Sequence, residues 1–207
     1  VLQGRGLGGR LVSYITEQGR RAGYDYIGSS FGVTPALLGF WTKQGWVPAR
    51  LSIQRGASSG AHSLLMLTHL SPRGEDLLLK ARGRFVAQFP YQLCDSLRGL
   101  DADLVCSLMK NAGPSGIEPD EADLADVRAF ACGQRLLEVS IGSVWRWVCH
   151  TLMSSSRASQ LGKQELTLLV ARVLQKHGWQ ECAQQTGVAG RAQAQAVLRG
   201  AIAKLIG

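Results

Sequence analysis

The sequence predicts an α/β domain over residues 1–70, followed by an all-helical region over residues 71–207. Three observations support this fold class. A glycine-rich turn opens the chain and leads into an amphipathic segment. A run rich in aromatic and β-branched residues and bounded by glycines follows over residues 24–31, as is typical of a strand, and two further strand-like runs come after it. After Ser71 the apolar residues recur with helical spacing almost to the end of the chain.

The α/β part is expected to contain two helices and three strands. Leu7, Leu11 and Ile15 recur every four residues and indicate a helix directly after the glycine-rich turn. Thr34 is a typical N-cap residue, and the following Pro35 suits the first turn of a second helix. In order, the predicted elements are a helix from residue 7 to residues 19–23, a strand over 24–31, a helix over 36–44, and strands over 46–54 and 62–70.

The helical part begins at a second helix start, Ser71 to Glu75. Its clearest linkers are residues 111–116 and 154–156, which are rich in Gly, Pro and Ser. Helices are predicted over residues 76–84, 91–100, 102–110, 121–132, 136–153, 165–177 and 191–206.

The composition is that of an ordinary soluble domain, with 45% apolar and 18% charged residues among 207. No apolar run reaches the roughly 18 residues of a membrane span, and the start shows no signal peptide, so a cytoplasmic protein without a membrane partner is expected. The five cysteines lack C-x-x-C spacing and histidines at ligand distance, which favours free thiols over disulfides and predicts no metal site. They are Cys94, Cys106, Cys132, Cys149 and Cys182.

The formal net charge of +8 is unevenly distributed. Residues 1–70 carry seven Lys or Arg against two acidic residues, a net +5, and the remainder carries sixteen against thirteen, a net +3. A positive field of this size favours polyanions such as coenzyme A or nucleic acid.

The opening motif Gln3-x-x-Gly6-x-Gly8 has the chemistry of a pyrophosphate-binding loop. Glycines allow an anion to approach backbone N–H groups, and the following helix N-terminus favours negative charge. A tight structural turn is the alternative explanation, whereas an ATP loop is disfavoured because no G-x-x-x-x-G-K-[ST] occurs. The residues assigned to coenzyme binding by this motif are Gln3, Gly4, Arg5, Gly6, Leu7, Gly8 and Gly9.

The motif matches the Q/R-x-x-G-x-G/A signature of GNAT acetyltransferases, and the order of predicted elements after it is similar to that fold. The resemblance narrows to the tRNA(Met) cytidine acetyltransferase family over residues 3–71. The blocks that carry it, in order, are Ser29 to Pro35, Phe40 to Trp46, Arg50-Leu51 and Ala57 to Gly60. Beyond residue 71 it is positional, because a helical tRNA-binding tail stands in this place in the family.

The resemblance implies transfer of acetyl from acetyl-CoA to N4 of the wobble cytidine in elongator tRNA(Met). ATP and Mg would act only in an upstream helicase-like module of the same polypeptide. The resemblance also implies a coenzyme contact on the second predicted helix. There Lys43 keeps the positive charge found in the family, whereas Ala36 stands where the family often has a glutamate. The sequence identifies no catalytic base.

A tRNA backbone surface is expected on basic residues of the tail, although a solvated helical face explains the same residues. They are Arg146, Arg157, Lys163, Arg172 and Lys176. Only Val1 and Leu2 precede the Gln3 loop, so the strand that GNAT folds place there is missing, and the chain is expected to be a C-terminal fragment that is inactive alone. A GNAT enzyme for a protein or small amine, and a non-catalytic helical interaction module, remain alternatives.

Overall fold

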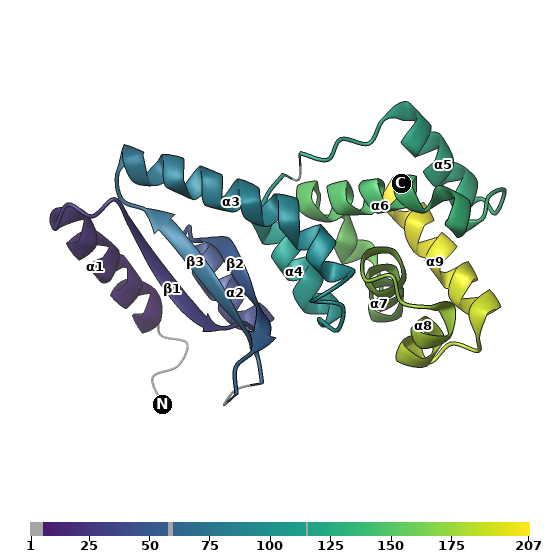
Figure 1. Cartoon of the computed structure of the whole chain (residues 1–207), viewed down its shortest axis with the longest axis horizontal. Coiled ribbons are helices and arrows are strands. Elements are labelled where there is room, and N and C mark those ends of the chain that lie inside the picture. Colours follow the sequence, from purple (N-terminus) through teal and green to yellow (C-terminus); the bar gives the residue numbers. More distant parts are fainter. Residues whose placement is uncertain (1–5, 58–59, 115) are drawn as a thin grey trace. The chain divides into compact units, whose positions relative to one another are not determined.

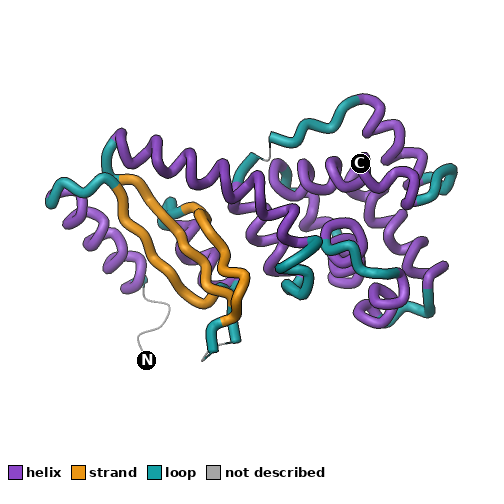
Figure 2. The backbone as a smooth tube through the Cα atoms, in the orientation of Figure 1, coloured by secondary structure: helices purple, strands orange, loops and turns teal. Residues whose placement is uncertain are grey.

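The computed structural model describes residues 6–57, 60–114 and 116–207. The chain divides into two compact units, residues 1–85 and residues 86–207, and the division falls within a single helix, α3 (Pro72–Leu93). Figures 1 and 2 show an α/β arrangement in the first unit and helices throughout the second. The predicted fold class is therefore confirmed. Within the described residues, no helix is both long and apolar enough to cross a membrane.

The first unit is built on a three-stranded antiparallel sheet in the order β1-β3-β2. Its elements follow the predicted order, with α1 before the first strand and α2 between the first and second strands. Figure 1 shows α1 running beside β1 and α2 behind the sheet. Their bounds are α1 Leu7–Arg21, β1 Tyr26–Gly32, α2 Pro35–Lys43, β2 Val47–Arg55 and β3 His62–His69.

The two short helices of this unit differ in how they are held. The Thr34 hydroxyl accepts a hydrogen bond from Leu37 N (3.2 Å) and caps α2, as the sequence predicts, and Leu38 is fully buried. Helix α1 buries no residue among those described, and its apolar stripe includes Leu11 and Tyr14, which are 59% and 63% exposed. This stripe is an apolar surface that the described part of the chain leaves uncovered.

The start of α3 is fixed to the start of β1 through Asp25. The Asp25 carbonyl accepts from Leu70 N (2.8 Å), and its carboxylate accepts from the Ser71 hydroxyl (2.6 Å), which in turn caps Gly74 N. The backbones approach so closely that a Cβ on Gly74 would lie 1.7 Å from Asp25 O. Glycine is therefore required at position 74.

The second unit is a set of packed helices with a core of apolar side chains from all of them. Asp101 caps α4, and Asp120 and Asp123 form a capping box at the start of α5. The elements are α4 Ala102–Ala112, α5 Glu121–Ala131, α6 Leu137–Ser154, a 3₁₀ turn Arg157–Gln160, α7 Lys163–Leu169, a π-helical turn Val170–Leu174, α8 Trp179–Thr186 and α9 Arg191–Ile206.

The expectation of separate helices over residues 76–84 and 91–100 is wrong. Helix α3 runs unbroken from Pro72 to Leu93 with Pro90 inside it, and residues 94–100 form turns. Proline removes one backbone hydrogen bond, but Val86, Phe89 and Leu93 lie on one helical face and are all buried. Burial of this face outweighs the lost hydrogen bond.

The predicted helix over residues 165–177 is also corrected. It becomes α7 and a π-helical turn, after which Lys176 takes a left-handed conformation (φ 57°). Helix α8 was not predicted from the sequence. The sequence signal for α8 is limited to Gly178 at its start and Glu181 three residues later. The Glu181 carboxylate accepts a hydrogen bond from Gly178 N (2.7 Å) and so caps the helix.

Candidate functional site

The N-terminus of α1 is the part of the glycine-rich motif that the structure describes, since Gln3, Gly4 and Arg5 lie outside the described residues. Gly6 has a left-handed backbone (φ 71°) and is the N-cap of α1. Its carbonyl accepts from Arg10 N (3.1 Å), the first hydrogen bond of the helix. No described side chain caps this end, and the first turn has no acidic residue. The backbone N–H groups of Leu7, Gly8 and Gly9 thus lie at a helix N-terminus, where the helix dipole favours an anion.

Helix α2 packs directly against this glycine-rich start. A Cβ on Gly8 would lie 3.4 Å from the Phe40 ring, and a Cβ on Gly9 would lie 3.2 Å from the Gln44 amide. The sequence argument offered two explanations for these glycines, close approach by a coenzyme and a tight structural turn. The structure adds a further reason, because they also let α2 come close to α1.

Lys43 is exposed in the last turn of α2, immediately before Gln44, whose side chain lies against Gly9. The helix C-terminus itself favours a cation there. Lys43 and Arg10 therefore place two positive charges on the two helices that meet at the glycine-rich start. Ala36, at the other end of α2, is exposed and adds no charged group.

The aromatic residues after the motif pack on one another. The Phe31 and Trp41 rings stack with centroids 5.7 Å apart, and Trp41 also contacts Phe40 (5.4 Å) and the buried Trp46 (4.6 Å). This cluster holds α2 on the sheet, which supports core packing over RNA stacking for these side chains. His62 is likewise structural, since it is buried and its Nδ1 lies 2.9 Å from Ser52 O.

Three of the five basic residues expected to bind tRNA have partners within the helical unit. They are Arg146, Arg157 and Arg172. Arg146 binds the buried Asp123 carboxylate through two nitrogens, one of them 2.8 Å from Oδ2. Arg157 donates to the carbonyls of Leu205 (2.8 Å) and Ile206 (2.9 Å) at the end of α9. These arginines stabilise the fold through contacts that sequence reasoning had no means to detect.

The other basic residues of this set differ in accessibility. Arg172 lies over the Trp179 ring (4.8 Å) and 3.7 Å from Glu138. Lys176 is half-buried, and this burial lowers the pKa of its amine. Lys163 is exposed at the start of α7. Of the five, Lys163 is the residue best placed to meet a large anion.

Two of the cysteines in the helical unit have unreactive thiols. Burial raises the pKa of Cys106 and of Cys149 to about 12, so both thiols stay protonated near neutral pH. Across the described ranges no three His, Cys, Asp or Glu side chains gather closely enough to hold a metal ion. The site that the structure assembles best is the α1 N-terminus with α2 beside it.

Most of the first unit matches a known protein family. Residues 10–71 match the family model GNAT acetyltransferase 2, a span that covers nearly all of α1 and continues through β3 to Ser71. The match starts at Arg10, so Gln3 to Gly9 lie outside it.

Over its whole length the chain is similar to curated proteins named tRNA(Met) cytidine acetyltransferase TmcA. It is 44% identical over 207 residues to the protein of Nitrosococcus halophilus, covering 100% of this chain and 28% of that protein. Identity is 30% over 208 residues with the protein of Vibrio cholerae (99% of this chain, 27% of that one) and 33% over 187 residues with that of Haloferax volcanii (89% and 24%). The chain thus spans about a quarter of the length of these relatives.

Proposed function

The chain belongs to the tRNA(Met) cytidine acetyltransferase family and carries a GNAT acetyltransferase domain, and from this premise we propose its reaction. The proposed reaction is transfer of acetyl from acetyl-CoA to N4 of the wobble cytidine of elongator tRNA(Met). The chain would act as the C-terminal part of a longer, ATP-dependent enzyme. In this reaction the N4 nitrogen attacks the thioester carbonyl, the coenzyme A thiolate leaves, and the nitrogen loses a proton.

The coenzyme site is proposed at the N-terminus of α1. Its amides would bind the pyrophosphate, with Gln3, Gly4 and Arg5 completing the loop ahead of Gly6. The observation that carries this proposal is the left-handed Gly6 N-cap followed by a first turn that no described side chain caps. Lys43 would contact a coenzyme phosphate from α2, which the close packing of Gln44 on Gly9 supports.

The tRNA partner is proposed for the helical tail, residues 71–207, and residues 1–70 are proposed as the C-terminal part of the GNAT domain. Lys163 is the best basic candidate for an RNA phosphate, since Arg146, Arg157 and Arg172 already have partners within the fold. A tRNA substrate would place the protein in the cytoplasm. ATP and Mg are assigned to an upstream helicase-like module of the same polypeptide.

An acetyl-transfer assay on the longer protein tests the proposal. The enzyme is incubated with radiolabelled acetyl-CoA, ATP, Mg²⁺ and tRNA, and the RNA is digested to nucleosides. The expected result is label in N4-acetylcytidine from elongator tRNA(Met), and none when the wobble cytidine is replaced by uridine.

The alternatives give different results in the same assay. A GNAT enzyme for other acceptors would label a protein or a small amine and leave the tRNA unlabelled. A non-catalytic interaction module would transfer no label to any acceptor. Either result would overturn the proposed reaction.

A further inference from the structure

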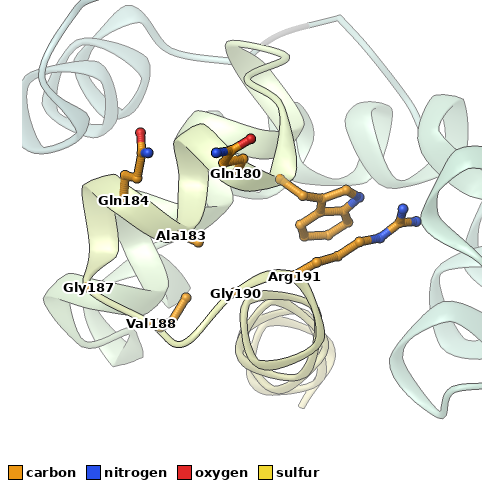
Figure 3. Close-up of a pocket in the computed structure, with 8 residues that line it drawn as sticks. Gln180, Ala183, Gln184, Gly187, Val188, Gly190 and Arg191 are labelled. Carbon is orange, nitrogen blue, oxygen red and sulfur yellow. The ribbon is translucent and has the colours of Figure 1, made fainter.

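A cavity of about 640 Å³ opens between α8 and the start of α9. Its deepest side chains are the buried Trp179, Ala183 and Val188, which make an apolar floor. The exposed Gln180, Gln184 and Arg191 also line it, and Figure 3 shows the amides of the two glutamines turned away from Arg191. Its size falls within the roughly 300–1,000 Å³ of small-molecule sites.

Arg191 is held in place at this cavity. Its guanidinium lies 5.9 Å from the centre of the Trp179 ring, and its NH2 lies 3.3 Å from Glu138 Oε1. The same carboxylate oxygen accepts from Trp179 Nε1 (3.0 Å), so Glu138 fixes both partners. Figure 3 shows the Arg191 side chain extended alongside the indole. A guanidinium fixed in this way loses little freedom on binding a ligand.

The fixed arginine still faces solvent. The Arg191 side chain is 62% exposed, whereas Arg172, which covers the Trp179 ring at 4.8 Å, is 16% exposed. Two arginines share the single carboxylate of Glu138 here, so the cluster carries a net positive charge. The outer side of the Arg191 guanidinium is therefore available to a planar, negatively charged ligand.

We propose that the α8–α9 cavity binds one unpaired nucleotide of RNA. The base would stack on the exposed side of the Arg191 guanidinium, next to the apolar floor of the cavity. Unpaired RNA bases are commonly recognised by stacking on aromatic or guanidinium planes. A negatively charged peptide would satisfy the charge of Arg191 but would make less use of a planar guanidinium beside an apolar floor.

This inference deepens the proposed function and rests on RNA being the substrate. The test is fluorescence anisotropy of the full chain with a short labelled single-stranded RNA, and with the same RNA annealed as a duplex. Arg191→Gln removes the charge and Arg191→Lys keeps it without the planar group. Arg128→Gln is the matched control, because Arg128 is an exposed arginine on α5 in the same helical unit.

The wild-type chain should bind the single strand more tightly than the duplex. Both Arg191 variants should weaken single-strand binding by roughly five- to 150-fold, the range expected for one stacked base, while Arg128→Gln changes it less than twofold. Thermal unfolding of each variant shows that the fold is retained.

Five results would overturn the inference. Retained affinity in Arg191→Lys would mean that Arg191 meets only a phosphate, and equal losses in Arg191→Gln and Arg128→Gln would mean a diffuse charge effect. Binding of polyglutamate in place of RNA would identify an acidic polypeptide as the ligand. Absence of RNA binding by the wild-type chain even at low salt would overturn both this inference and the tRNA-binding role of the tail, whereas an Arg191-independent RNA affinity would overturn this inference alone.

Discussion

Replacement of Gly74 by alanine should destabilise the first unit, because no room exists for a Cβ. The added atom would lie 1.7 Å from Asp25 O, about half of an ordinary carbon–oxygen contact distance, so the start of α3 must move away from β1. That movement breaks the hydrogen bonds that Leu70 N and the Ser71 hydroxyl make to Asp25.

The expected loss follows from the contacts at this junction. Two hydrogen bonds contribute about 1 kcal/mol each, and overpacking costs about 1–3 kcal/mol. Against this, alanine is favoured over glycine inside a helix by about 0.5–1 kcal/mol. The Gly74→Ala variant should therefore lose roughly 2–4 kcal/mol of its free energy of unfolding.

Gly83 in the same helix provides the control. A Cβ there would have no described atom within 4 Å, and Gly83 is exposed. Gly83→Ala should therefore stabilise the protein by about 0.5–1 kcal/mol, the opposite sign to Gly74→Ala. Urea denaturation followed by circular dichroism measures both. Equal free energies of unfolding for the two variants would refute the close approach of Gly74 and Asp25. If Gly74→Ala cannot be purified, Ser71→Ala, which removes the hydroxyl alone, should still lose about 1 kcal/mol.

Three further predictions concern single charges. Lys43→Ala should raise the Michaelis constant for acetyl-CoA at low salt, and an unaltered constant would remove Lys43 from the coenzyme site. Lys163→Glu should weaken tRNA binding in gel-shift titrations at low salt while leaving the thermal unfolding temperature unchanged; a loss of folding instead would show a structural role. The Arg146 guanidinium holds the pKa of Asp123 at about 2, below its unfolded value near 3.8. The stabilisation of the folded state by this ion pair is therefore complete above about pH 4 and is lost as the pH falls to 2. It is on the order of 1 kcal/mol because Arg146 is 45% exposed to solvent. Asp123→Asn should remove this part of the acid dependence of the free energy of unfolding.

Local signals predicted the α/β unit well. Its first strand carries a run of aromatic and β-branched residues between glycines, and Thr34 with Pro35 marks the start of α2 by chemistry that depends on neighbouring residues alone. The helical unit was harder, because Pro90 is a local helix breaker whose effect is overcome by the burial of Phe89 and Leu93 on α3. Packing of that kind has no local signature.

The candidate sites show the same division between local signals, which the sequence reveals, and long-range contacts, which it does not. The glycine-rich signature identified a helix N-terminus correctly. A second match, Gln184-x-x-Gly187-x-Ala189, lies in the turn from α8 to α9, where Gly187 is the C-cap of α8. The signature alone therefore does not distinguish a coenzyme loop from a structural turn. The partners of Arg157 lie 48 and 49 residues away along the chain, so its role at the end of α9 was not predictable from sequence spacing.

Calorimetry of acetyl-CoA binding to the longer protein tests the coenzyme site at the α1 N-terminus most directly. Gly6→Glu adds bulk and a negative charge at the left-handed N-cap, whereas Gly83→Glu adds the same charge at an exposed position of α3. Gly6→Glu should lower the affinity by well over tenfold, and Gly83→Glu should leave it unchanged. Equal affinities of the wild type and a folded Gly6→Glu variant would contradict the assignment of the pyrophosphate to this helix.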